Sequence, residues 1–324
     1  MTYLAYQVQE LDGTFIGDVK TLETPALQEG HILIKVEYSS LNYKDALAAT
    51  GVKGVVKQYP FTPGIDSAGT VIKTSSDDFS VGDKVVLTGY KMGMSVNGGF
   101  GEIVHAPAKW AVKLPANLTL LHSMEIGTAG LTAAASVKKL EDAKISKELP
   151  VLVSGATGGV GSLAINILNK LGYTVHALTG KTYEEDMIKS MGAIELINRD
   201  KFLEDGIKPL DKAIYSAAID TVGGDILSKM LSMVNNNGVV TSCGNVAGAK
   251  FTSSVFPFIL RGISLHGIDS AESSIELKKT LWNKLANEWL VSLESQTKIV
   301  SLNNVGPEII KILDGNQIGR IVIK

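Results

Sequence analysis

The clearest chemical signal in the sequence is a glycine-rich turn between an apolar run and an amphipathic segment. The stretch Val151–Gly172 reads VLVSGATGGVGSLAINILNKLG, with glycines at 155, 158, 159 and 161. Glycine lets the backbone approach a ligand closely because it carries no Cβ atom. The helix that follows would offer free N–H groups and a positive dipole end, which suit a pyrophosphate. A ligand-free turn fits the same glycines, but the flanking strand, helix and second βα unit favour a dinucleotide site.

The end of the second strand of this unit indicates which dinucleotide is bound. Sites for NAD usually place an acidic residue about 20 residues further on, where it binds the ribose 2′-hydroxyl. Here that strand ends in ALTGK, so Thr179, Gly180 and Lys181 stand in place of the acid. A hydroxyl and a cation suit a 2′-phosphate, and Arg199 after the next strand could add a second cation. Lys181 also fits a solvated lysine at a helix start, but the missing acid predicts NADPH over NADH.

Later strand ends carry further glycine-containing stretches. DTVGG spans Asp220–Gly224, and SCGN spans Ser242–Asn245. Ligands bind at the carboxyl edge of doubly wound sheets, so the backbone of these stretches could border the nicotinamide. Glycine turns and a small buried cysteine are the alternatives. The expected cofactor contacts of the first turn and of the second stretch are Ala156, Thr157, Gly158, Gly159, Val160, Gly161, Cys243, Gly244 and Asn245.

The predicted secondary structure that positions these turns changes along the chain. Up to about Leu121, strands such as HILIKVEYSSL dominate, with one short helix in YKDALAATG. From Ser123 an alanine-rich helix leads into strands that alternate with helices, which predicts βαβ units and a parallel sheet. The tail EIIKILDGNQIGRIVIK reads as a helix, a turn and a closing strand. It is too small to fold alone, so we expect it to complete the first domain, with the α/β domain as an insertion.

The composition excludes several classes of protein. The 324 residues suggest about two domains. The net charge of −2 and pI near 6.2 weigh against a nucleic-acid-binding protein, which usually carries a basic excess. The start MTYLAYQVQELDG does not read as a signal peptide, and no apolar run of about 18 residues predicts a membrane span. The single cysteine, Cys243, excludes an intramolecular disulfide. A soluble cytoplasmic protein is the default expectation.

Together these motifs resemble the medium-chain dehydrogenase/reductase superfamily. The resemblance rests on FTPGIDSAGTV, GDKVV, GGFGEIV, GTAGLTAA, SGATGGVG, IDTVGG and NQIGRIVIK, which occur in the family order over nearly the whole chain. SSLNYKDALAATG and FPFILRGISLHGIDS resemble the YhdH/YhfP-type quinone oxidoreductases, a branch that includes acryloyl-CoA reductases. The implied α/β fold is a GroES-like β-rich catalytic domain (1–122 and 269–324) with an inserted Rossmann doubly wound domain (123–268), and the active site in the cleft between them. The resemblance also places Thr128 and Arg320 at the cofactor.

The chain departs from the zinc-dependent relatives at the positions of their metal ligands. Those relatives have GHE where this chain has Gly64-Ile65-Asp66, and a ligand cysteine where it has Asn42. Isoleucine cannot bind a metal, and zinc needs nitrogen or thiolate ligands at fixed spacing. We therefore expect no metal site and exclude a zinc alcohol dehydrogenase.

Without a metal, an electrophilic substrate is favoured. An unactivated ketone usually needs help at its oxygen, whereas a C=C bond conjugated to a carbonyl, or a quinone, needs orientation, enolate stabilisation and a proton. The resemblance makes Asn42, Tyr43 and Asp66 the candidate catalytic residues. Asn42 would donate to the substrate carbonyl or the nicotinamide ribose, Tyr43 would give a proton or line the cleft, and Asp66 would orient Asn42 or a water. The alternatives are a left-handed turn residue, a core aromatic and a turn cap, with water as proton donor.

The substrate and the partners are the last inference from the sequence. Arg261, Lys44, Lys53 and Lys57 could meet the phosphates of a coenzyme A ester, with surface charge as the alternative for the lysines and an internal carboxylate for Arg261. We expect a zinc-independent, NADPH-dependent reductase of conjugated carbonyls, with acryloyl-CoA as first candidate and a quinone second. A non-catalytic NADPH-binding protein stays open. Family analogy suggests a homodimer through GISLHGID, which equally fits an internal strand.

Overall fold

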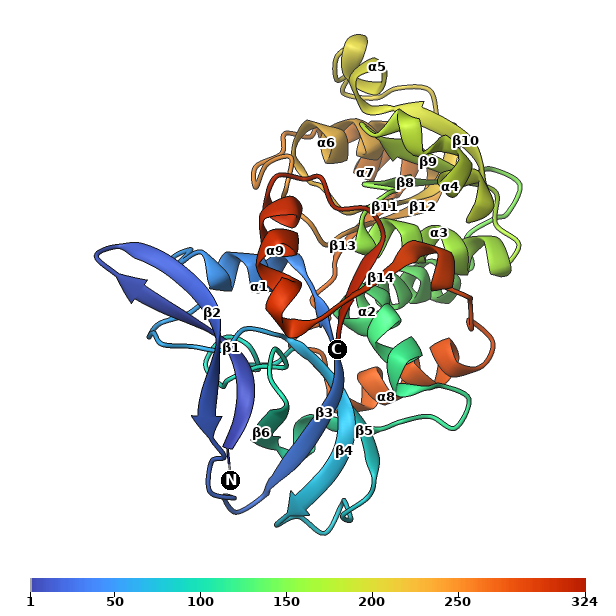
Figure 1. Cartoon of the computed structure of the whole chain (residues 1–324). Coiled ribbons are helices and arrows are strands. Elements are labelled where there is room, and N and C mark those ends of the chain that lie inside the picture. The colour runs from blue at the N-terminus through green and yellow to red at the C-terminus, as the bar shows by residue number, and fades with distance from the viewer. Residues whose placement is uncertain (1) are drawn as a thin grey trace. The chain divides into compact units, whose positions relative to one another are not determined.

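The computed structural model describes residues 2–324, which form two compact units. The first unit runs up to Thr128 and includes Ser270–Asn287 and Ser292–Lys324. The second unit comprises Ala129–Asp269 and Glu288–Val291. Figure 1 shows the order of the elements along the chain. None of the helices within residues 2–324 combines the length and the apolar character needed to cross a membrane.

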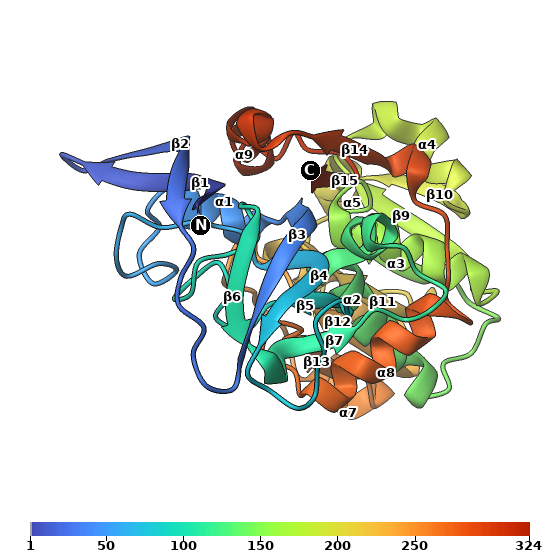
Figure 2. The same cartoon turned by 60° about the horizontal axis from the view of Figure 1, so that its bottom comes forward.

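The first unit is built mainly of antiparallel strands. β1 (Thr2–Leu11) and β2 (Thr14–Glu23) form a two-stranded sheet, and a seven-stranded sheet has the order β14-β15-β3-β4-β5-β7, with β6 paired to β3. Figure 2 shows β3, β4 and β5 side by side. The strands of the larger sheet are β3 (His31–Leu41), β4 (Asp66–Thr74), β5 (Lys84–Thr88), β6 (Ile103–Pro107), β7 (Ala111–Lys113), β14 (Thr297–Val300) and β15 (Arg320–Ile323).

The tail closes this sheet, as the sequence predicted. β15 pairs antiparallel with β3, with Ile321 opposite Leu41, so residues almost 300 positions apart become neighbours. Isoleucines of β15 and of the preceding helix join a buried core around Leu41 and Phe100. The helices of this unit are α1 (Tyr43–Ala49), the start of α2 (Leu120–Asp142), α8 (Ile275–Ala286) and α9 (Val305–Leu313), with 3₁₀ turns at Ala108–Trp110, Glu294–Gln296 and Leu302–Asn304.

The second unit contains a six-stranded parallel sheet in the order β10-β9-β8-β11-β12-β13. This is the order of a doubly wound dinucleotide-binding domain, in which the strand order reverses beside the first strand. Figure 1 shows α3 on one side of the sheet and α6 on the other. The elements are β8 (Val151–Ser154), α3 (Gly159–Lys170), β9 (Val175–Thr179), α4 (Glu185–Ser190), β10 (Ala193–Asn198), α5 (Arg199–Glu204), β11 (Tyr215–Asp220), α6 (Gly224–Met233), β12 (Val234–Ser242), α7 (Phe256–Arg261) and β13 (Ser264–Gly267), with a 3₁₀ turn at Thr182–Glu184.

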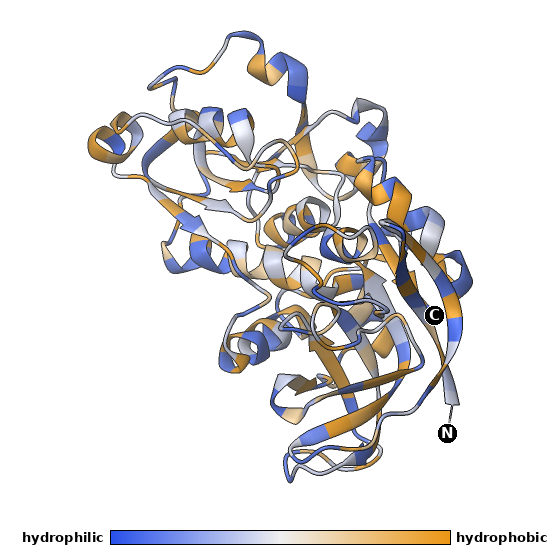
Figure 3. Ribbon diagram, turned by 90° about the vertical axis from the view of Figure 1, so that its left-hand side faces the viewer, coloured by the Kyte–Doolittle hydropathy of each residue, from blue (hydrophilic) through white to orange (hydrophobic). Residues whose placement is uncertain are grey.

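Burial explains why these segments become strands. Every residue of β8 and β11 is buried, as expected for central strands covered on both faces. Figure 3 shows apolar segments along the strands, with polar segments gathered at many turns. The apolar runs therefore fix which strands lie at the centre of the sheet.

Two helix ends differ from the sequence prediction. The pattern of GDILSKMLSMVNNNG predicts one helix, but α6 ends at Met233 and Val234–Asn237 begin β12. Val234 pairs with Tyr215 of β11, and valine and asparagine are weak helix formers, so strand pairing prevails. The apolar stripe of SIELKKTLWNKLANEWLVSL predicts a helix over the whole segment, but α8 ends at Ala286, where Asn287 leaves helical geometry.

Candidate active site

The predicted glycine turn has the geometry that a dinucleotide diphosphate needs. Gly155 has φ +60°, and a Cβ atom there would lie 2.2 Å from Thr221 Oγ1. A Cβ atom on Gly161 would lie 2.3 Å from the Gly155 oxygen, so only glycine lets α3 pack against the turn. Gly158 caps α3, and within residues 2–324 no side chain caps its first turn. The first N–H groups and the dipole of α3 are thus available to an anion.

A buried carboxylate fixes the strand ends beside this turn. Asp220, at the end of β11, accepts hydrogen bonds from Ser154 Oγ at 2.9 Å and from Ser242 Oγ at 2.9 Å. The Gly223 N–H reaches both of its oxygens at 3.0 Å. Asp220 therefore joins β8, β11 and β12 at one edge of the sheet. Its role is structural, and the sequence reading, which considered only the backbone here, missed it.

The residues predicted to hold a 2′-phosphate lie at the ends of β9 and β10. The Lys181 N–H donates to Thr179 Oγ1 at 3.1 Å, and Thr157 Oγ1 lies 3.4 Å from the same oxygen. A Cβ atom on Gly180 would lie 3.2 Å from Arg199 Cζ, so the guanidinium covers this glycine. Arg199 also pairs with Asp200 at 3.3 Å. Burial lowers the pKa of Lys181, with a nearby glutamate opposing the shift, so a bound anion would stabilise its charged form.

The later stretch SCGN lies at the same sheet edge, but its backbone packs closely against Asp220 and Thr221. The Cys243 N–H and thiol both point at the Asp220 carbonyl oxygen, at 3.0 and 3.4 Å. Burial and then the Asp220 charge raise the pKa of Cys243 to about 12, so the group is a thiol at neutral pH. A Cβ atom on Gly244 would lie 1.8 Å from the Thr221 oxygen. Cys243 is partly buried, and the cofactor contacts of Cys243, Gly244 and the exposed Asn245 stay predictions.

In the first unit, the candidate residues gather around Asp66, at the start of β4. Its side chain is 0% exposed, yet Oδ2 accepts from Ser40 Oγ at 2.6 Å, Asn42 Nδ2 at 2.8 Å and the Thr128 N–H at 2.9 Å. Oδ1 accepts from Thr128 Oγ1 at 2.5 Å, and Arg320 Nη2 lies 4.0 Å from Oδ2. We call Ser40, Asn42, Asp66, Thr128 and Arg320 the Asp66 cluster. Its donors satisfy a carboxylate that would otherwise be costly to bury.

A glycine kink in α2 makes this cluster possible. Gly127 has φ +52° and ψ −158°, which breaks the helix and frees the Thr128 N–H for Asp66. A Cβ atom at this position would lie 2.5 Å from Asp66 Oδ2 and 2.7 Å from Arg320 Nη2. Thr128 was predicted to contact the cofactor, but its amide and hydroxyl are directed at Asp66.

Asn42 is held by several partners at once. It is the N-cap of α1 with extended backbone (φ −125°, ψ 161°), so the alternative of a left-handed turn residue is wrong. Besides Asp66, its Nδ2 lies 3.2 Å from the Ser40 oxygen and 3.3 Å from Asp45 Oδ2, and its Oδ1 accepts from Arg320 at 3.3 Å. Asp66 is thus hydrogen-bonded to the Asn42 amide, and its role in orienting Asn42 or a water stays a prediction. A direct bond from Asn42 to substrate would have to displace one of these acceptors.

Tyr43 and Asp45 follow Asn42 in the first turn of α1. Tyr43 is half-buried, and within residues 2–324 its hydroxyl makes no hydrogen bond. Asp45 is fully buried, and burial and then the charge of Asp66 raise its pKa to about 7, against hydrogen bonds from Asn42 and Ile65. Sequence reasoning missed Asp45, although an acid three residues after an N-cap asparagine is the signature of a capping pair.

Both predicted arginines have internal partners. Arg320 is 2% exposed and donates to the Glu125 oxygen at 3.0 Å and to Ser40 Oγ at 2.9 Å, so it serves the Asp66 cluster, and its cofactor contact stays a prediction. Arg261 donates to the carbonyl oxygens of Ser232 at 2.7 Å and Val234 at 3.1 Å, and to that of Asp211. The expected carboxylate partner is wrong: the guanidinium binds carbonyls. These carbonyl oxygens engage the guanidinium that was expected to meet a coenzyme A phosphate.

The positions of zinc ligands in related enzymes carry other chemistry here. Ile65 is buried, and Asn42 and Asp66 are engaged with each other. Across residues 2–324, no group of three or more His, Cys, Asp or Glu side chains is placed to hold a metal ion.

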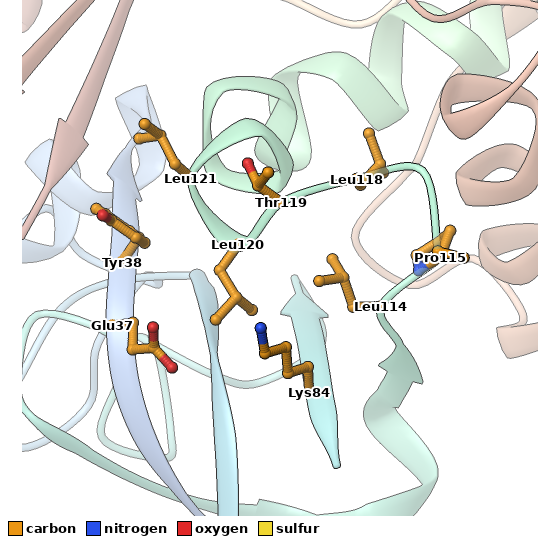
Figure 4. A pocket seen from close by; sticks show the side chains of 10 residues that line it. Glu37, Tyr38, Lys84, Leu114, Pro115, Leu118, Thr119, Leu120 and Leu121 are labelled. Carbon is orange, nitrogen blue, oxygen red and sulfur yellow. The ribbon is translucent and has the colours of Figure 1, made fainter. Parts of the chain in front are cut away.

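A separate pocket lies in the first unit. Its volume is about 590 Å³, and Figure 4 shows Glu37 and Lys84 facing the leucines at the start of α2. None of the predicted site residues lines this pocket, so we do not assign it to the active site.

Comparisons with known proteins identify the family of the chain. Residues 28–116 match the alcohol dehydrogenase GroES-like domain model, and residues 159–287 match the zinc-binding dehydrogenase model. Acrylyl-CoA reductase AcuI of Ruegeria pomeroyi is 38% identical over 99% of this chain and 98% of its own. YhfP of Bacillus subtilis, provisionally named a quinone oxidoreductase, is 40% identical over 94% of each chain.

Solved structures confirm the predicted fold class. YhdH of Salmonella enterica in complex with NADP has a TM-score of 0.95 and 37% identity, covering 100% of this chain and 99% of its own. YhfP of Bacillus subtilis with NAD bound has a TM-score of 0.96 and 39% identity, with the same coverage. The likeness extends over both units and over all the motifs that first suggested it. The chain belongs to the YhdH/YhfP branch of the medium-chain dehydrogenase/reductase superfamily, a superfamily of oxidoreductases.

Proposed function

We propose that this chain is an NADPH-dependent reductase that adds hydride to the β-carbon of a conjugated carbonyl compound. The observation that carries the cofactor choice is the end of β9, where the Arg199 guanidinium lies over Gly180, between Thr179 and Lys181, and no acidic side chain directly follows the strand. Acryloyl-CoA is the first candidate substrate, which the name of the Ruegeria pomeroyi relative supports. The bound NADP of the Salmonella enterica relative supports the cofactor, whereas the NAD bound to YhfP makes a direct comparison of the two cofactors necessary.

The cofactor-binding roles follow from the residues of the second unit. The turn from Ala156 to Gly161 would bind the diphosphate through backbone N–H groups and the α3 dipole. Thr179, Lys181 and Arg199 would hold the 2′-phosphate. When bound, the nicotinamide ring supplies a hydride from its C4 atom.

The remaining chemistry requires a proton for the α-carbon and a stabilised enolate oxygen. We assign the proton to Tyr43, because its hydroxyl has no internal partner in the described chain. A hydride at the β-carbon and a proton at the α-carbon complete the saturation of the double bond. We assign Asp66 to orient Asn42, and Asn42 to contact the substrate oxygen or the cofactor ribose by exchanging one of its present acceptors.

Anaerobic oxidation of NADPH tests this assignment. We expect turnover with acryloyl-CoA that exceeds turnover with simple quinones at matched concentrations. Much faster turnover of quinones would replace the thioester by the second candidate, a quinone, which the provisional name of YhfP supports. Tight NADPH binding without turnover of any enone or quinone would identify a non-catalytic binding protein instead.

We also propose that the second unit mediates a homodimer. β13 is an edge strand of the parallel sheet, and an exposed edge is a template for pairing with a second copy. Exposed apolar side chains lie on and before α7, which precedes β13: Val246, Phe251, Val255, Phe256, Ile259 and Leu260. Ile259 is 68% exposed, so Ile259→Lys should leave the monomer folded and shift the mass measured by light scattering to that of a monomer. A wild-type protein that is monomeric at micromolar concentration would contradict this proposal.

A further inference from the structure

One buried carboxylate joins the two segments that carry Asn42 and Asp66. Asp45 Oδ1 accepts from the Ile65 N–H at 2.8 Å and from the Gly64 N–H at 3.1 Å. Its Oδ2 accepts from the Asn42 N–H at 2.8 Å and lies 3.3 Å from Asn42 Nδ2. All of these partners are N–H donors, so the carboxylate holds the N-cap of α1 against the turn that leads into β4.

The turn at Gly64–Ile65 is also held from a second side, by the backbone at Gly99 and Phe100. Gly64 has φ +110°, and a Cβ atom there would lie 2.6 Å from the backbone nitrogens of Gly99 and Phe100. The Gly64 oxygen accepts from the Gly99 N–H at 2.8 Å. Asp45 on one side and this loop on the other therefore set the direction in which Asp66 leaves the turn.

The same carboxylate sets the orientation of the Asn42 amide. Asn42 Nδ2 lies between Asp45 Oδ2 and Asp66 Oδ2, at 3.3 and 2.8 Å, while Arg320 donates to the amide oxygen. Loss of Asp45 would leave the Asn42 N–H without its acceptor and would remove one of the three acceptors around its amide nitrogen. Tyr43 directly follows this cap, so its backbone starts from the position that these contacts fix.

The charge of Asp45 is costly to folding. It is 0% exposed, and the like charge of Asp66 is close enough to raise its pKa. At this third helical position a serine could accept the Asn42 N–H without the cost of a buried charge. A carboxylate accepts two backbone N–H groups at one oxygen and orients an amide at the other, which a hydroxyl cannot do.

We propose that Asp45 is a positioning residue that acts through Asn42 in the reduction step. The proposal rests on the proposed function, which assigns Asn42 and Tyr43 to the substrate. It implies that Asp45 and Asn42 are energetically coupled in kcat, and that Asp45 has no separate contact with the cofactor.

A double-mutant cycle in full-length protein tests the coupling. The variants are Asp45→Asn, Asn42→Ala and their combination, assayed for kcat, KM and NADPH affinity on whichever substrate the wild type turns over. We expect Asp45→Asn to lower kcat by about tenfold or more with NADPH affinity unchanged, and the combination to lose at most about twofold beyond Asn42→Ala. Asp83→Asn is the matched control, because Asp83 also accepts a backbone N–H, from Ser80, outside the Asp66 cluster.

The outcomes separate this proposal from the proposed function. If the two single effects on kcat multiply in the combined variant, Asp45 and Asn42 act independently and the proposal is overturned. If Asp45→Asn lowers the melting temperature but leaves kcat unchanged, the role of Asp45 is purely structural, which also overturns the proposal. Failure to turn over acryloyl-CoA would overturn the substrate assignment and leave the cycle to be run with a quinone. If Asp45→Asn does not fold, Asp45→Glu keeps the charge and displaces it by one methylene, and the same coupling in kcat is expected.

Discussion

Removing the two cations at the end of β9 should weaken NADPH binding selectively. In Lys181→Ala the 2′-phosphate loses a partly buried ammonium group, and in Arg199→Ala it loses a guanidinium that is 53% exposed. An ion pair at about 4 Å is worth about 4 kcal/mol at an effective dielectric constant near 20 and about 1 kcal/mol in water. Because Lys181 is the more buried of the two, we expect its loss to cost about 2 kcal/mol, or roughly thirtyfold in Kd, and the loss of Arg199 about fivefold.

Titration calorimetry with NADPH and NADH at low and high salt measures this effect. We expect the affinity for NADH to change by less than about threefold in either variant, since NADH has no 2′-phosphate. Lys189→Ala is the matched control, because Lys189 is a lysine of the same unit that pairs with Glu185 at 2.7 Å. Gly180→Asp should act in the same direction, because its carboxylate would meet Arg199 and repel the phosphate. Equal losses for both cofactors, or no loss for NADPH, would refute the assignment of this site.

Three further predictions concern the first unit. Gly127→Ala should lower the free energy of unfolding by about 3 kcal/mol in urea titrations, because its Cβ atom would meet Asp66 and Arg320. The control is Gly30→Ala, which also has a positive φ but open space around it and should cost about 1 kcal/mol. Equal costs for the two variants would contradict the steric argument. Asp66→Asn should cost about 3 kcal/mol in the same assay, because the amide nitrogen turns a donor toward Ser40 or Thr128 and the variant loses the carboxylate that acts most strongly on Arg320. A change below about 1 kcal/mol would contradict the ionised cluster. The Asp45 carboxyl has a pKa of about 7 in the folded chain against 3.8 for the free group, so between these values the folded state retains a proton that the unfolded state releases. The stability of the wild type relative to Asp45→Asn should therefore fall as pH rises from about 4 to 7, by up to about 1.4 kcal/mol per pH unit, and then level off. Melting curves of both proteins from about pH 5 to 9 measure this fall, and a difference in melting temperature that stays constant with pH would contradict the prediction. The charged groups that act on Asp45 or are acted on by it are Asp66 and Arg320.

The features that could be predicted from the sequence are local ones. The glycines of the first turn and the residues at the end of β9 lie within one βαβ unit, where spacing alone fixes which side chains share the sheet edge. The return of the tail to the first domain also followed from its small size. In each case a few adjacent residues contain the physical reason.

The features that could not be predicted depend on distant contacts. Arg320 reaches Ser40 across 280 positions of sequence, and this pairing exists only because β15 lies beside β3. The end of α6 at Met233 likewise depends on the pairing of Val234 with Tyr215. Asp45 was visible as a capping acid, but its contact with the Gly64–Ile65 backbone requires the folded turn.

Transfer of a labelled hydride is the most direct test of the proposed reaction. The enzyme is incubated anaerobically with NADPH deuterated at either face of C4 and with acryloyl-CoA, and the products are analysed by mass spectrometry. We predict that one of the two labelled cofactors yields propionyl-CoA with one deuterium at the β-carbon, in equal amount to the NADP formed. Consumption of NADPH without propionyl-CoA, or a product without deuterium from either cofactor, would contradict hydride transfer to a conjugated thioester.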